Sequence, residues 1–168
     1  MRVSIGVPVY NAERFLDAAL RSLRQQTFED FELIIADNAS TDATAEIAHA
    51  HAGEDRRVRY VRSDENLGAA RNFNRVFHLS NGEYFKWAAD DDVCAPKYLE
   101  RCVGVLDDHP DVAWCHSRVG LIDPDDLGVP EGPAVGESGM SYVQADPERG
   151  ELADSPTRAN PHPHLRLR

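Results

Sequence analysis

The apolar residues of this chain fall into two kinds of segment that alternate along it. Short continuous apolar runs indicate buried strands, and longer segments with apolar residues every three or four positions indicate helices. The predicted strands are residues 3–8, 31–37, 58–61, 84–87 and 112–116. The predicted helices are residues 15–26, 43–52, 69–79 and 96–107. Strands that are apolar throughout are typical of a parallel sheet with helices on both faces, so we expect an α/β fold.

This regular pattern stops near Asp123. A further strand at residues 119–122 would pair with the strand at 112–116. Seven of the ten prolines lie after Asp123, and no sustained periodicity runs from residue 128 to residue 168. That composition is typical of loops or disorder. We therefore expect a domain at residues 1–123 and an irregular tail at residues 124–168.

A run of carboxylates, Asp90, Asp91 and Asp92, follows the predicted strand at residues 84–87. Like charges repel and each loses hydration when buried, so a fold keeps them most easily beside a cation. Carboxylate oxygens suit hard ions such as Mg²⁺ and Mn²⁺. Ligands of parallel sheets bind beyond the carboxyl ends of strands, where this run falls. A solvated acidic loop, or a cap for the next helix, is the alternative interpretation.

Four segments, taken in order, resemble family 2 glycosyltransferases of the GT-A fold. They are the loop at residues 8–13, the turns at residues 37–42 and 66–68, and the acidic run at residues 90–92. The resemblance covers residues 2–123 and implies the N-terminal, nucleotide-sugar-binding part of such an enzyme. It implies a Rossmann-like, mostly parallel sheet flanked by helices. Residues 124–168 would then be an acceptor-side segment or a tail.

The resemblance also implies which residues bind the nucleotide. In such enzymes the first loop and the acid after the second strand hold the base, and here those residues are Pro8, Tyr10 and Asp37. Arg71 would contact the diphosphate, with Arg75 as the competing choice. Because Asp37 can accept a hydrogen bond from a pyrimidine N–H, UDP or dTDP is expected ahead of GDP as the donor nucleotide.

The resemblance also implies that the acidic run binds the metal. Asp91 matches the carboxylate that binds the divalent cation, Mn²⁺ or Mg²⁺, which bridges the diphosphate. Asp90 would lie near the ribose, and Asp92 would support the metal site. Many relatives carry a further Asp at the first position of the motif, where this chain has Ala89.

The implied reaction is an inverting, metal-dependent transfer of a sugar from a nucleoside diphosphate sugar to an acceptor. The acceptor would be a saccharide, a lipid-linked compound or a small molecule. No residue matches the general base of the family, so the catalytic residue stays unassigned. Two alternatives remain open: a truncated nucleotide-binding domain with little or no transferase activity, and a nucleotidyltransferase-like enzyme.

Charge and composition limit the classes of molecule that the chain is expected to bind. The 168 residues carry a net charge of −11, which argues against nucleic acid because phosphate backbones need a basic patch. A divalent cation can still neutralise a sugar nucleotide. With no signal peptide and no long apolar run, we expect a cytoplasmic setting and leave peripheral membrane contact open. The three cysteines predict no disulfide framework.

Overall fold

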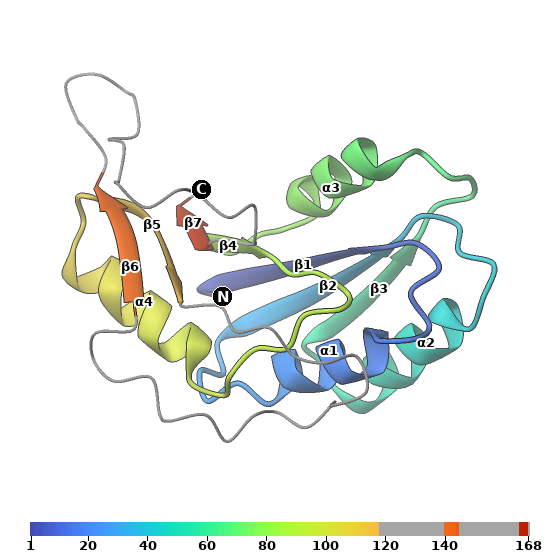
Figure 1. The fold of residues 1–168 in the computed structure, drawn as a ribbon, viewed down its shortest axis with the longest axis horizontal. Coiled ribbons are helices and arrows are strands. Elements are labelled where there is room, and N and C mark those ends of the chain that lie inside the picture. The colour runs from blue at the N-terminus through green and yellow to red at the C-terminus, as the bar shows by residue number, and fades with distance from the viewer. Residues whose placement is uncertain (118–139, 145–164, 168) are drawn as a thin grey trace.

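The structure is a computed structural model that describes residues 1–117, 140–144 and 165–167. The strands are β1 (Val3–Val9), β2 (Phe31–Asp37), β3 (Val58–Arg62), β4 (Tyr84–Trp87), β5 (Val112–Ser117), β6 (Met140–Gln144) and β7 (Leu165–Leu167). The helices are α1 (Leu16–Arg24), α2 (Thr44–Glu54), α3 (Ala69–His78) and α4 (Tyr98–Asp108). The described strands form one sheet in the order β3-β2-β1-β4-β7-β5-β6 (Figure 1).

The first four strands form a parallel block with β1 at its centre. β1 pairs in parallel with β2 and β4, and β2 pairs in parallel with β3. Val9 lies opposite Asp37, and Gly6 lies opposite Trp87. The carboxyl ends of these strands therefore meet at the same edge of the sheet, where loops can build a ligand site.

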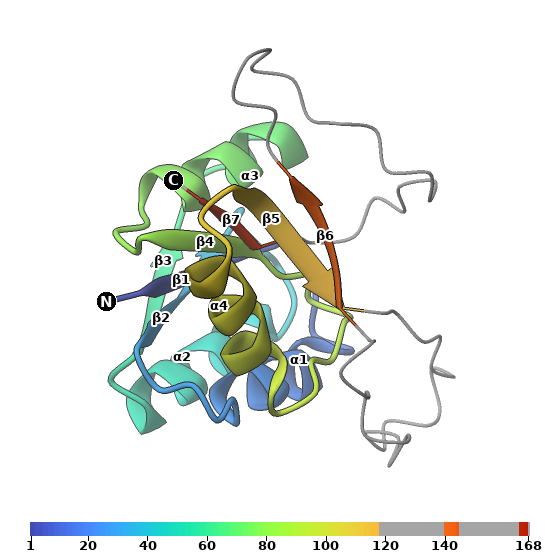
Figure 2. The same cartoon turned by 90° about the vertical axis from the view of Figure 1, so that its left-hand side faces the viewer.

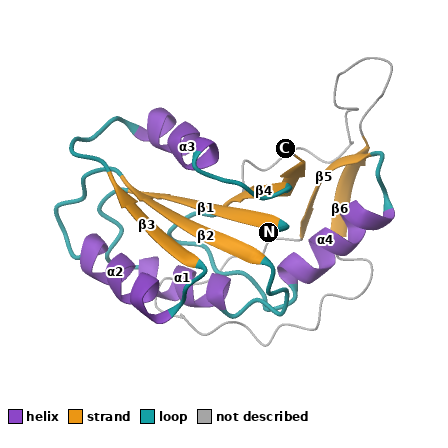
Figure 3. Ribbon diagram, turned by 180° about the vertical axis from the view of Figure 1, so that it is seen from behind, coloured by secondary structure: helices purple, strands orange, loops and turns teal. Residues whose placement is uncertain are grey.

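Helices cover both faces of this block, as predicted for a GT-A sheet. α1, α2 and α4 lie on one side and α3 lies on the other (Figures 2 and 3). The larger core packs the apolar side chains of α1 and α4 against one face of β1 and β2. On the other face, a Cβ atom at Gly6 would lie 2.8 Å from Phe85 and 2.9 Å from Val76. Glycine at this position therefore allows α3 to pack closely on the sheet.

The part of the sheet beyond β4 departs from the sequence-based expectation. β7 runs antiparallel between β4 and β5, and β6 pairs antiparallel with β5. The tail at residues 124–168 was expected to be irregular, and these two strands come from it. Segments of three and five residues are too short for a period of two to stand out in a sequence. The strand predicted at residues 119–122 lies outside the described residues.

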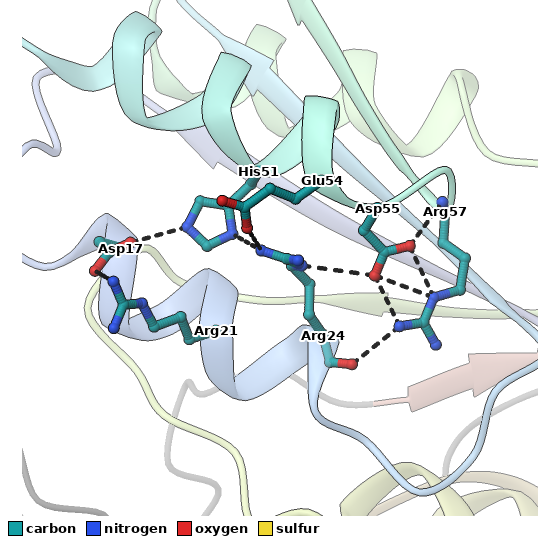
Figure 4. A network of polar contacts seen from close by, with 7 residues as sticks. All are labelled: Asp17, Arg21, Arg24, His51, Glu54, Asp55 and Arg57. Carbon is teal, nitrogen blue, oxygen red and sulfur yellow. Dashed lines mark hydrogen bonds and ion pairs between the residues drawn. The ribbon is translucent and has the colours of Figure 1, made fainter.

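A chain of polar contacts joins α1, α2 and the turn before β3 (Figure 4). Arg24 bonds to Nδ1 of His51 at 2.9 Å, and Nε2 of His51 bonds to Asp17 at 2.9 Å. Arg57 binds Asp55 and also donates to the backbone carbonyl of Arg24 at 3.0 Å. Because His51 is buried, these contacts satisfy polar groups that packing removes from water.

Two further expectations concern membranes and cysteines. Among the described residues, no helix has the length and apolar character needed to cross a membrane. Cys94, Cys102 and Cys115 are all free thiols, as the sequence predicted.

Candidate functional site

The loops after β1 and β2 are joined by reciprocal hydrogen bonds at the carboxyl edge of the sheet. The backbone N–H of Asn11 donates to Oγ of Ser40 at 3.0 Å, and Oδ1 of Asn11 accepts from the N–H of Thr41 at 2.9 Å. Similar bonds run from Glu13 N to Asp42, from Ala43 N to Glu13 and from Ala12 N to Thr44. The two loops therefore form one rim above β1 and β2.

Two residues of this rim have left-handed backbone conformations. Asn11 has φ 51° and Ala39 has φ 62°. Asparagine tolerates this region because its short polar side chain can hydrogen-bond to the nearby backbone, but alanine has no such compensation and is strained there. Both residues belong to the motifs that the sequence analysis singled out, so the rim depends on turns of uncommon shape.

Pro8 and Tyr10, two of the predicted base-binding residues, flank the end of β1. Pro8 is buried and lies opposite Ala36 of β2 in the sheet. The side chain of Tyr10 follows the strand and is 49% exposed. The structure thus leaves the aromatic ring of Tyr10 accessible at the rim and places Pro8 within the sheet.

Asp37, the third predicted base-binding residue, is fully buried at the end of β2. Its Oδ1 accepts from the N–H of Ser40 at 2.8 Å, and its Oδ2 accepts from Tyr60 at 2.6 Å and Arg62 at 2.8 Å. Burial raises the pKa of Asp37, but the hydrogen bonds from Ser40 and Tyr60 and the charge of Arg62 outweigh it and lower the pKa overall. Asp37 is therefore an ionised, well-satisfied carboxylate.

Tyr60 and Arg62 are site residues that sequence reasoning missed. Both come from β3, and Arg62 lies directly opposite Asp37 in the parallel register. The sequence indicated the strand but not its register, because nothing in the residues of β2 and β3 says which residue of one strand lies opposite which residue of the other. Arg62 is 42% exposed, so its guanidinium forms the open side of the Asp37 environment.

The turn before α3 is held against the β2 loop by two asparagines. Nδ2 of Asn38 donates to Oδ1 of Asn66 at 2.8 Å, and Oδ1 of Asn38 accepts from the N–H of Leu67 at 2.8 Å. Oδ1 of Asn66 also accepts from the N–H of Gly68, whose φ of 81° suits glycine. The motif residues at 66–68 thus fix where α3 begins.

The two candidate arginines of α3 differ in environment. Arg71 is exposed in the first half of the helix. Arg75 is half-buried, and within the described part of the chain its Nη1 is buried with no hydrogen-bond partner. Between them, Asn72 donates to the carbonyl of Ala36 at 2.7 Å and anchors α3 to β2. Arg71 is thus the more accessible of the two arginines.

The acidic run begins three residues after β4 ends. The N–H of Ala88 donates to the carbonyl of Gly6 at 2.9 Å, which extends the sheet towards the run. Asp90 and Asp92 are half-buried, and Asp91 is exposed. Burial, followed by the charges of Asp91 and Asp92, raises the pKa of the Asp90 carboxyl. The loop therefore holds negative charge that its own neighbours do not offset.

The donor set of this loop fits a hard divalent cation. Carboxylate oxygens are available, and none of the described basic side chains forms an ion pair with Asp90, Asp91 or Asp92. In residues 1–117 and the two short strands, no three His, Cys, Asp or Glu side chains converge on a common metal position. In Mg²⁺-type sites, one or two carboxylates share the ion with substrate phosphates and water.

Comparison with protein families gives a match over most of the chain. The sequence model of "Glycosyl transferase family 2" matches residues 4–150. An abequosyltransferase, RfbV, of Salmonella typhimurium is 35% identical over 121 residues, which are 70% of this chain and 36% of that protein. The chain spans between 33% and 51% of the length of the first three curated relatives that it matches.

Solved structures give the same result. S. aureus TarS 1–349 in complex with UDP-GlcNAc has a TM-score of 0.62 at 28% identity, over 67% of this chain and 33% of that one. The mannosyltransferase PcManGT of Pyrobaculum calidifontis, in complex with GDP-Man and Mn²⁺, has a TM-score of 0.63 at 27% identity. That match covers 75% of this chain and 37% of the mannosyltransferase.

Proposed function

The chain belongs to glycosyl transferase family 2, and on that premise we propose that it carries the donor-binding part of an enzyme that transfers a sugar from a nucleoside diphosphate sugar to an acceptor. The observation that carries this proposal is the common edge of the parallel strands. There the β1 and β2 loops form one rim, with Asp37 at the end of β2 and the acidic run following β4. This is the position at which α/β sheets bind their ligands.

In this proposal the nucleotide base lies against the rim. The exposed ring of Tyr10 offers an apolar surface for the base, and Pro8 supports the loop from within β1. Asp37 accepts the N–H of a pyrimidine, which favours UDP or dTDP over GDP. Because Asp37 is fully buried, a base reaches it only if a neighbour moves, and the half-exposed Arg62 is best placed to do so. Arg71 is the proposed contact to the diphosphate.

In this proposal the acidic run binds the divalent cation that accompanies the diphosphate of the donor. Asp91, the exposed member, is the proposed metal-binding carboxylate, Asp92 supports it, and Asp90 lies near the ribose. Mn²⁺ or Mg²⁺ bound there would act as a Lewis acid on the leaving diphosphate. The carboxylates of the loop would hold the ion beyond the end of β4.

The proposed reaction inverts configuration at the transferred sugar carbon. Solved relatives are complexed with UDP-GlcNAc, UDP and GDP-Man, which supports a nucleoside diphosphate sugar as the donor class. We propose a saccharide, a lipid-linked compound or a small molecule as the acceptor. No described residue is assigned as the general base.

Calorimetric titration of the 168-residue chain with UDP, dTDP and GDP, each with and without Mn²⁺, tests the proposal. We expect UDP or dTDP to bind more tightly than GDP, and Mn²⁺ to strengthen that binding at least about tenfold. Pyrophosphate with Mn²⁺ is the control, and it should bind more weakly than UDP because it lacks the base. A chain that binds none of the nucleotides contradicts the proposed function, and binding that ignores Mn²⁺ contradicts its metal dependence.

A further inference from the structure

Lys86 is a buried lysine in β4 that the site described above does not use. Its side chain is 2% exposed, and the residue lies beside Ile5 of β1, at a position surrounded by apolar core. Nζ donates to the carbonyl of Trp87 at 3.2 Å and lies 4.8 Å from the centre of the Tyr98 ring. Among the described residues, one carbonyl and one aromatic face contact Nζ, although an ammonium group has three protons to donate.

This environment is unfavourable for a positive charge. In the part of the chain that the structure describes, no carboxylate lies within ion-pair distance of Lys86. A buried charge without an opposite charge destabilises the folded state, and an apolar side chain of similar volume is often more stabilising. Packing alone therefore does not explain why a lysine occupies this buried position, and a role in binding would explain it.

The acidic run follows this lysine closely in the sequence. β4 ends at Trp87, the acidic run follows, and the chain then returns through Cys94 to Tyr98, whose ring covers Lys86. Nζ of Lys86 contacts the carbonyl of Trp87 and the ring of Tyr98, so both ends of the segment that carries the acidic run lie against the lysine.

We propose that Lys86 is a positioning residue that supplies a buried positive charge beneath the Asp90–Asp92 loop, so that the loop binds a cation together with a diphosphate better than the cation alone. This inference rests on the proposed function. A bare divalent cation is repelled by Lys86. A nucleoside diphosphate bound with one such cation keeps a net negative charge, so Lys86 attracts the complex and offsets its repulsion by the three carboxylates.

The test uses Lys86→Met, which removes the charge and keeps most of the side-chain volume. Calorimetry measures Mn²⁺ alone, then UDP and GDP in saturating Mn²⁺. We expect Lys86→Met to bind Mn²⁺ alone about threefold or more tightly than the wild type, and to bind the better nucleotide about threefold or more weakly. Its melting temperature should equal or exceed that of the wild type, because an apolar isostere replaces a buried charge.

Two further variants separate charge from packing. Lys86→Gln loses the charge but can still donate to the carbonyl of Trp87, so it should follow Lys86→Met in both titrations. This second variant keeps the test available if Lys86→Met does not fold. Lys97→Met is the matched control, since Lys97 is the second of the two lysines and is exposed, and it should bind both ligands like the wild type.

The opposite directions of the two changes are the readout that a merely structural role would not produce. Weaker binding of both ligands with a lower melting temperature would overturn the inference, and so would variants that bind both ligands like the wild type. If the wild type itself binds neither nucleotide in Mn²⁺, the proposed function fails together with this inference. If the wild type binds and the variants do not differ from it, only this inference fails.

Discussion

Asp55 and Arg57 form a bidentate ion pair just before β3. Nε of Arg57 lies 3.0 Å from Oδ1 of Asp55, and Nη2 lies 2.8 Å from Oδ2 (Figure 4). The same guanidinium lies 4.3 Å from the centre of the Phe31 ring. The side chain of Asp55 is only 12% exposed, so solvent screens this pair little. Planar contacts of this kind are the stronger class of ion pairs.

This pair predicts an acid-sensitive contribution to stability. The hydrogen bonds from Arg57, which outweigh the effect of burial, lower the pKa of Asp55 from 3.8 to about 2. A carboxyl with a lowered pKa in the folded state stabilises the protein fully above the unfolded value. That contribution is lost as the pH falls from about 4 to about 2, and amounts to about 2 kcal/mol.

Urea denaturation of wild type and Asp55→Asn at several pH values measures this contribution. The variant should have the lower free energy of unfolding at pH 6, and the difference should shrink towards pH 2. Glu54→Gln is the control, because Glu54 belongs to the same contact network but is 65% exposed. A difference between wild type and Asp55→Asn that stays constant with pH would contradict the assignment.

The left-handed conformation of Ala39 predicts a stabilising substitution. Ala39→Gly relieves the strain at φ 62° and should raise the free energy of unfolding by about 0.5–1 kcal/mol, after the greater freedom of glycine in the unfolded chain is subtracted. Urea denaturation measures the change. Ala50→Gly, on the exposed side of α2, should instead lower stability by about 0.5–1 kcal/mol. Equal losses in the two variants would show that Ala39 is unstrained.

The metal assignment predicts a selective loss in Asp91→Asn. The substitution removes a charge and little volume from an exposed position, so the melting temperature should not change. UDP binding in Mn²⁺ should fall to the level seen without the metal, a loss of at least about tenfold. Asp108→Asn, at an exposed carboxylate on α4, should bind as the wild type does. Undiminished Mn²⁺ dependence in Asp91→Asn would remove Asp91 from the metal site.

The base-binding assignment predicts a nucleotide-specific effect of Asp37→Ala. Loss of this acceptor should weaken uridine or thymidine nucleotides by about 1–3 kcal/mol, the usual cost of an unpaired polar group. Pyrophosphate, which has no base, should bind the variant as it binds the wild type. Calorimetry with the two ligands provides the comparison.

Because Asp37 is buried among three hydrogen-bond donors, its loss also affects stability. Tyr60→Phe removes one of these donors, the hydroxyl that lies 2.6 Å from Asp37, and keeps the carboxylate. This control should lower the melting temperature while retaining the preference for UDP over pyrophosphate. An Asp37→Ala protein that keeps the same preference would show that the base binds elsewhere.

The sequence sufficed for elements whose own residues carry the signal. The run Phe31–Asp37 is apolar almost throughout and is a strand for that reason, and the predicted helix at residues 69–79 differs from α3 by one residue. Features that depend on how the strands pair could not be predicted from the sequence. The contact of Arg62 with Asp37 follows from strand register, and β6 and β7 join the sheet through strands distant in the sequence.

The burial of Lys86 could not be predicted from the sequence for a different reason. Its position in a short apolar strand was visible, but a lysine there reads equally well as a solvent-facing residue. Only the packing of α4 and the return of the chain to Tyr98 bury it. Burial of a polar side chain in a central strand is set by what covers the strand, and a single sequence does not contain that information.

The hydrogen bonds between the β1 and β2 loops have a kinetic and entropic consequence. Asn11 and Ser40 lie on different loops, yet each fixes the backbone of the other's loop before any ligand arrives. A pair of free loops would lose conformational entropy on closing around a nucleotide, at a cost set by every residue ordered. Here folding has already ordered them, so the rim is preorganised. Association would then proceed as docking onto a preformed rim, with the side chain of Arg62 as the part that moves, and differences in affinity among nucleotides would arise mainly from their dissociation rates.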